Sequence, residues 1–147
     1  GDDDWYFSEG QASVAMLMRG AGIPARGSVH ELVSLLDMHA IVSKSLDADW
    51  QGTDANLPAA LGGMEREYVI SNSIFPGQTY KLDIRTREYE CRFETETPTR
   101  LDGTVDMRDA SEIIYRKGTR ERVEDSALSA YFRSIAWEHV RSFHHER

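Results

Sequence analysis

Few residues of this chain have the types and spacing that nucleophilic catalysis needs. The sequence contains a single cysteine, Cys91, and five histidines. Cys91 alternates with Tyr89 and Phe93 in a run of period two, which places its thiol on the apolar face of a strand. Burial raises the pKa of a thiol, so we interpret Cys91 as a structural residue rather than a nucleophile. No catalytic residue is assigned.

The histidines and aspartates also lack the spacing of a metal site. Two ligands on one helical face need positions i and i+4, but the residue four positions after His139 is Phe143. The aspartates between positions 102 and 109 do not follow the EF-hand pattern, and Asp102-Gly103 is explained by a hairpin turn. We therefore predict neither a metal nor a cofactor.

Three residues, together with a carboxylate such as Asp83, are candidates for lining a small-molecule pocket. Trp50 lies in an irregular stretch, Tyr80 in a strand-like run and His139 within a helical stripe. A half-buried histidine titrates near neutral pH. An enzyme or small-molecule binder with a pocket between sheet and helices is thus the alternative functional hypothesis. Core packing, and anchoring of the loop by Trp50, explain the same residues without a ligand.

The longest periodic segment is Glu124–Phe143, which predicts an amphipathic helix laid on a core. Its inner stripe comprises Leu128, Tyr131, Phe132, Ile135, His139 and Phe143. Trp137 lies on the opposite face, with Arg133 and Arg141 four positions before and after it. Tryptophan and arginine are enriched at the centres of interfaces, so these three are candidate partner-binding residues. Stacking of the arginines on the indole, or cover by Trp5–Phe7, are the alternatives.

From Glu67 the apolar period changes to two, which predicts antiparallel strands with one wet face. Pro76-Gly77 fits a type II turn joining the first two strands. The strand candidates are Glu67–Phe75, Gln78–Thr86, Glu88–Thr97, Thr99–Leu101, Thr104–Met107 and Glu112–Arg116.

Charged residues alternate with apolar ones along Glu88–Thr97. The outward set is Glu88, Glu90, Arg92, Glu94 and Glu96, facing Lys81, Arg85 and Arg87 of the neighbouring segment. Cross-strand ion pairs explain this pattern, and a docking face for a basic partner is the alternative.

The N-terminal half is predicted to be helical. Ser8 and Ser28 each begin a capping-box pattern, which predicts helices through Met18 and over Val29 to about His39. Beyond His39, continuation of the helix to Lys44 and a short extended piece at 40–42 are the two alternatives. The expected inner stripe of the second helix is Val29, Leu32, Val33, Leu36 and Ala40, widened by Leu35. An irregular insert follows at about 45–66, with a single turn near Pro58–Leu61. We predict one α+β domain over 1–147, with an antiparallel sheet of four to six strands packed against N-terminal helices and the long C-terminal helix.

The composition limits the classes of partner. A net charge of −8 repels phosphate backbones and anionic lipids, and acids neutralise the basic cluster at 116–122, so we expect no nucleic-acid or membrane binding. No apolar run approaches the roughly 20 residues of a membrane span, and no signal peptide is recognised. With a single cysteine, these features predict a cytoplasmic protein.

The functional prediction follows from the acidic charge and the missing catalytic constellation. We predict a non-enzymatic, acidic protein-binding or regulatory module that acts through protein–protein contacts. Another protein, of basic character, and a second copy in a homodimer are the partners considered. Trp137→Ala is expected to weaken that association while leaving thermal stability nearly unchanged.

Overall fold

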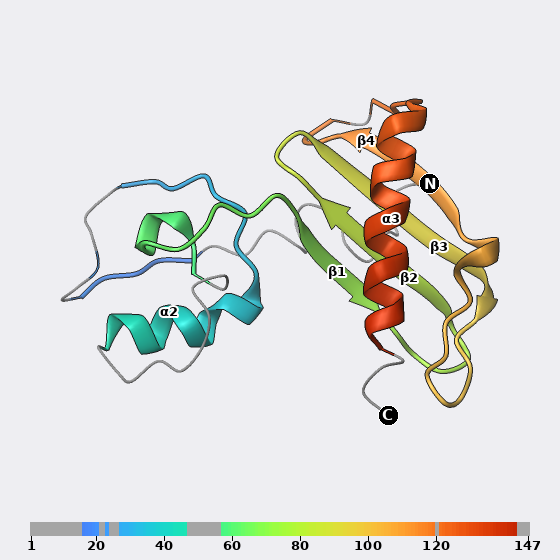
Figure 1. Ribbon diagram of the computed structural model, residues 1–147, viewed down its shortest axis with the longest axis horizontal. Helices are drawn as coiled ribbons and strands as arrows, with labels where there is room; N and C mark the ends of the chain where they lie inside the picture. The colour runs from blue at the N-terminus through green and yellow to red at the C-terminus, as the bar shows by residue number, and fades with distance from the viewer. Residues whose placement is uncertain (1–15, 21–22, 24–26, 47–56, 120, 144–147) are drawn as a thin grey trace. The chain divides into compact units, whose positions relative to one another are not determined.

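The computed structural model describes residues 16–20, 23, 27–46, 57–119 and 121–143 of the 147. Two compact units are present, one within Ser13–Val69 and one containing Ile70–Arg147, and each is described by itself. The fold class is α+β, as predicted, with a four-stranded antiparallel sheet and helices (Figure 1). The assignment of the whole chain to one domain stays a prediction.

The sheet is a meander in which the strand order follows the chain order. Its strands are β1 (Val69–Ser73), β2 (Thr79–Arg85), β3 (Tyr89–Pro98) and β4 (Ser111–Arg116). The register places Leu82 opposite Phe93 and Ile84 opposite Cys91. Because side chains alternate between the two faces, this register gathers the apolar residues on one face.

The turn between β1 and β2 forms where it was predicted. The Gln78 backbone N–H donates to the Phe75 carbonyl at 3.0 Å, and Gly77 has a φ of 81°. A type II turn needs a positive φ at its third position, which only glycine adopts without strain. Pro76-Gly77 therefore fixes the register of the first hairpin.

The predicted strands Thr99–Leu101 and Thr104–Met107 are absent. A tight turn does form at Asp102-Gly103, where the Arg100 N–H donates to the Thr104 carbonyl at 3.0 Å. The backbone of Thr99, however, bonds to Gln78 at 2.8 Å and so continues the β2–β3 ladder. A short 3-10 helix, η5 (Met107–Asp109), then leads into β4.

The predicted C-terminal helix is present as α3 (Ser126–Ser142), and it lies across the sheet (Figure 1). Asp125 caps it by accepting the N–H groups of Ala127 and Leu128 at 2.8 and 3.0 Å. The buried residues of α3 are Phe132, Ile135, Ala136 and Val140. Tyr131, expected on the inner stripe, is 37% exposed, so the buried face is turned from Tyr131 towards Val140.

The second predicted helix begins later than expected. Residues 28–34 are not helical; η2 (Leu35–Asp37) and α2 (Met38–Ser45) follow, and η4 (Ala59–Leu61) forms the predicted single turn. The capping box belongs to Ser34, whose N–H donates to the Asp37 carboxylate at 2.8 Å. Arg66 also contacts this carboxylate, at 2.6 Å.

The first predicted helix is only partly testable. Residues 16–18, its expected end, are not helical, and the remainder lies outside the described residues. Trp5–Phe7 also lies outside them.

Candidate functional site

Five large apolar side chains are exposed along η2 and α2, and four of them lie on one side of the helix. We call Leu35, Met38, Val42 and Leu46 the α2 stripe. Their separations of three, four and four positions place them on one side of a helix, and they are 73%, 37%, 48% and 74% exposed. Ala40 and Ile41, on the other side, are 1% and 2% exposed. The helix thus has two apolar sides, and the wider one faces water.

The α2 stripe contains no charged side chain. Between Leu35 and Leu46 the residues charged at neutral pH are Asp37 and Lys44, which fall on the opposite side of the helix at 100° per residue, while the exposed His39 falls on the side of the stripe. Leu36, 85% exposed, widens the apolar surface. Single exposed apolar residues are ordinary, but a contiguous group on one element is typical of an interaction surface.

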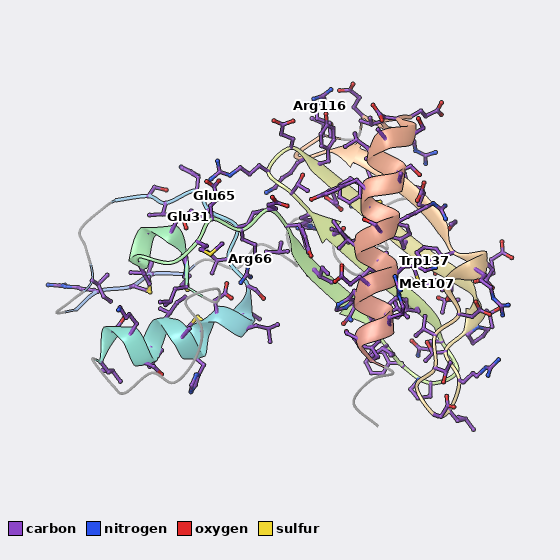
Figure 2. The ribbon with its side chains drawn as sticks, in the orientation of Figure 1. Glu31, Glu65, Arg66, Met107, Arg116 and Trp137 are labelled. Atoms are coloured by element: carbon purple, nitrogen blue, oxygen red, sulfur yellow. The ribbon has the colours of Figure 1, made fainter. Side chains whose placement is uncertain are left out.

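Polar contacts hold the helix behind the stripe. Asp37 is buried and paired with Arg66, while Glu31 accepts the Ala60 backbone N–H at 2.9 Å and so links this region to η4. Glu31 and Arg66 are labelled in Figure 2. Because these bonds fix the helix from its inner side, the stripe keeps its orientation without being covered.

The sequence pattern predicted the inner side of this helix only in part. Leu36 and Val29 were expected inside, yet Leu36 is 85% and Val29 46% exposed. Ala40 is buried, as predicted. The spacing of the α2 stripe was visible in the sequence, but periodicity does not tell which of two apolar sides faces a core.

The second candidate surface is the Trp137 patch, which we define as Arg133, Trp137 and Arg141; Trp137 is labelled in Figure 2. The Arg133 guanidinium lies 5.7 Å from the indole centre, and its Nε is 2.8 Å from Glu112 Oε2 on β4. Arg141 Nε donates to the Trp137 carbonyl at 3.4 Å. Trp137 is partly buried and both arginines are exposed. Stacking on the indole therefore occurs, and a role in binding stays a prediction.

Two of the three pocket candidates meet through a residue that the sequence did not single out. Asn72 of β1 places its Nδ2 2.9 Å from His139 Nε2 and 3.5 Å from the Tyr80 hydroxyl. The His139 ring also packs edge-on against Phe143 at 4.8 Å. The third candidate, Trp50, lies outside the described residues.

The chemistry of this polar group is structural. Burial lowers the pKa of His139 and raises the pKa of Tyr80 to about 12, an effect that the Asn72 hydrogen bond reduces. Near neutral pH the imidazole is therefore uncharged and the phenol keeps its proton. Both pKa values are thus shifted away from neutral pH, where a general acid or base needs them. The hydrogen bonds of Asn72 instead connect α3 to the sheet.

The face of the sheet expected to be wet contains buried charges. Asp83, Arg85 and Glu90 are 0%, 6% and 5% exposed, and Asp83 Oδ2 lies 2.6 Å from Arg85 Nε. Glu90 Oε1 is 2.6 Å from Arg92 Nε and 3.6 Å from Arg85 Nη2. The ion-pair explanation is thus confirmed for Glu90, while its outward, solvated placement was wrong.

Burial raises the pKa of the Asp83 carboxyl to about 7, against the opposing effect of Arg85. Within the described part of the chain, Asp83 Oδ1 accepts no hydrogen bond. Alternation along β2 and β3 predicted that these residues share a face. It did not indicate that the face is buried.

The remaining predicted residues have structural roles. Cys91 is fully buried, and burial raises the pKa of its thiol far above the usual range. Asp102 accepts the Thr104 N–H at 2.9 Å and Asp109 the Thr97 N–H at 2.8 Å, while Asp106 pairs with Arg108. Among the described residues, no three potential ligands are grouped to hold a metal ion.

Comparison with known proteins identifies no family for this chain. No protein-family model, no curated protein and no solved structure matches the chain. Across the residues that the structure describes, no helix has the length and apolar character needed to cross a membrane.

Proposed function

We propose that the protein is a non-enzymatic protein-binding module whose main contact surface is the α2 stripe. The observation that carries this proposal is the placement of four exposed apolar side chains on the side of α2 opposite its buried residues. Full burial of a Val, Leu or Met side chain stabilises by about 1.5–3 kcal/mol. Helices that dock into a partner's groove present anchors at this spacing.

The chemistry of the other clusters supports a binding rather than a catalytic role. Tyr80 and His139 are held by Asn72, and the Cys91 thiol is buried with a raised pKa. A nucleophile needs an accessible group of lowered pKa, which Cys91 is not. The acidic net charge of −8 favours approach of a basic partner at long range, whereas the stripe itself is uncharged and favours no sign of charge.

The Trp137 patch is the second contact surface in this proposal. Arg133 is already positioned between Glu112 and the indole, which reduces the rotamer entropy that would be lost when a partner binds. Replacing Trp137 by alanine removes the partly buried indole and leaves the four buried residues of α3 in the sequence. Partner affinity should fall, while stability changes by about 1 kcal/mol or less.

The proposal is tested by placing a photoreactive amino acid at single exposed positions of the chain in its native cell. Leu46 reports on the α2 stripe, Ala130 on the outer side of α3, and Leu101, 91% exposed in the loop after β3, is the matched control. We expect a discrete polypeptide adduct from Leu46, a second or identical one from Ala130, and none from Leu101. Adducts of equal yield from Leu46 and Leu101 would contradict the assignment of the stripe.

A further inference from the structure

We propose that the α2 stripe is occupied by a second copy of this chain, in an antiparallel helix pair about a twofold axis. This inference rests on the proposed function, because it names the partner of the same surface. It depends on three properties of the stripe: its spacing, its charge and its size.

The spacing of the stripe is nearly palindromic. A twofold axis that passes between Ala40 and Ile41 places Leu35 of one copy opposite Leu46 of the other. The same axis places Met38 of one copy nearly opposite Val42 of the other, with an offset of one position. A twofold contact is isologous, so each pairing occurs twice. The separations of three and four positions are those that let side chains of two helices interdigitate. Each large side chain of the stripe therefore meets another one.

The charge distribution favours a copy of this chain over a basic partner at this surface. Two chains of net charge −8 repel each other wherever acids face acids. The stripe avoids that repulsion, because Asp37 is buried against Arg66 and Lys44 lies on the opposite side of the helix. A basic partner would find no acidic group within the stripe.

Charge also distinguishes the α2 stripe from the Trp137 patch. An isologous contact through that patch would bring Arg133 and Arg141 of two copies together, and like charges at a contact oppose association. The patch therefore suits a different partner. Among the two candidate surfaces, only the stripe matches itself.

The size of the stripe sets the expected strength of the dimer. Stable dimers bury about 800 Å² per partner, and four side chains with Leu36 beside them supply a smaller apolar area. We therefore expect a weak dimer that dissociates on dilution. Its population should depend on protein concentration over the micromolar range.

The test is sedimentation equilibrium of the full chain with paired charge variants. The unmodified protein should approach twice its mass of 16.7 kDa at about 100 µM and dissociate on dilution. Leu35→Lys alone and Leu46→Glu alone should each be monomeric, because each would bury an unpaired charge. Mixing the two variants should restore a dimer, since the lysine of one faces the glutamate of the other. Leu101→Glu, the control, should dimerise as the unmodified chain does.

The outcomes distinguish this inference from the proposed function. Circular dichroism and the unfolding transition establish that each variant is folded. An unmodified chain that stays monomeric at 100 µM, or a dimer that persists in Leu46→Glu, overturns the second-copy inference. If the chain is monomeric and Leu46 still cross-links to a different polypeptide, the proposed function stands while this inference fails. A monomeric chain without such an adduct overturns both.

Discussion

The two compact units of this chain bury their apolar side chains to very different degrees. The unit containing Ile70–Arg147 has large side chains with no exposed surface: Tyr80, Leu82, Ile84, Phe93 and Phe132. The unit within Ser13–Val69 has large apolar side chains that are 97%, 85%, 74% and 68% exposed: Leu17, Leu36, Leu46 and Met64.

The difference reflects what each set of elements can enclose. A meander and one long helix offer two broad apolar faces that cover each other. The short helices η2, α2 and η4 are instead joined by polar bonds such as Arg66–Asp37 and Glu31–Ala60. The net contribution of one hydrogen bond to stability is about 0.5–1.5 kcal/mol. Such contacts therefore fix a conformation but do not form a hydrophobic core. The unit containing Ile70–Arg147 thus encloses a core of large side chains, whereas the unit within Ser13–Val69 leaves most of its large apolar side chains exposed.

The largest expected effect is on the free energy of unfolding, when a buried side chain of one unit and an exposed side chain of the other are each replaced by alanine. Phe132→Ala should lower the free energy of unfolding by about 3–5 kcal/mol, because it leaves a cavity between α3 and the sheet. Leu36→Ala, which removes an 85% exposed side chain, should change it by about 0.5 kcal/mol or less. Urea titration followed by circular dichroism measures both. Equal losses would show that the two units do not differ in packing.

A smaller effect concerns the buried charge in the sheet. The pKa of Asp83 is raised from 3.8 to about 7, so the folded state keeps a proton that the unfolded state releases near pH 4. Stability from this group is complete below about pH 4 and is lost as the pH rises through 7. Asp83→Asn should remove that decline between pH 4 and 7, as measured by unfolding at each pH. Parallel pH profiles for the two proteins would mean that Asp83 titrates normally.

The smallest effect has the opposite sign. Burial lowers the pKa of His139 below its usual 6.5, so the folded state favours the neutral imidazole. The stability it contributes is present above pH 6.5 and is lost as the pH falls through the folded value. His139→Gln keeps a partner for Asn72 but cannot titrate, so it should lose less stability in acid. Thermal unfolding from pH 5 to 8 tests this, and an NMR titration of His139 reports its pKa directly.

Much of the sheet unit was predictable because its signals are local. The Pro76-Gly77 turn, the alternation along β2 and β3 and the helical period of α3 each involve neighbours in sequence. Trp137, expected on the outer face of α3, is partly buried, because the buried face includes Ala136 and Val140. What alternation could not indicate is whether the second face of the sheet is covered, which is why the buried Glu90 was expected in water.

The candidate site on α2 was missed because its determinants are distant in sequence. Two sets of apolar positions compete along this helix, and the outcome depends on Arg66, 29 residues from its partner Asp37. Asn72 and His139 are 67 residues apart in sequence, and only the tertiary fold brings them into contact. Periodicity assigns residues to faces, whereas contacts between remote segments decide which face is buried.

The order of the elements in the chain has a consequence for synthesis on the ribosome. All four strands pair with sequence neighbours, so the pairing of the sheet does not require α3. Its covering helix, α3, ends 26 residues after β4 and is the last element of the sheet unit to be made. Until α3 packs on the sheet, Tyr80, Leu82 and Phe93 have no cover from it. A chain truncated before α3 is therefore expected to aggregate more readily than the full chain.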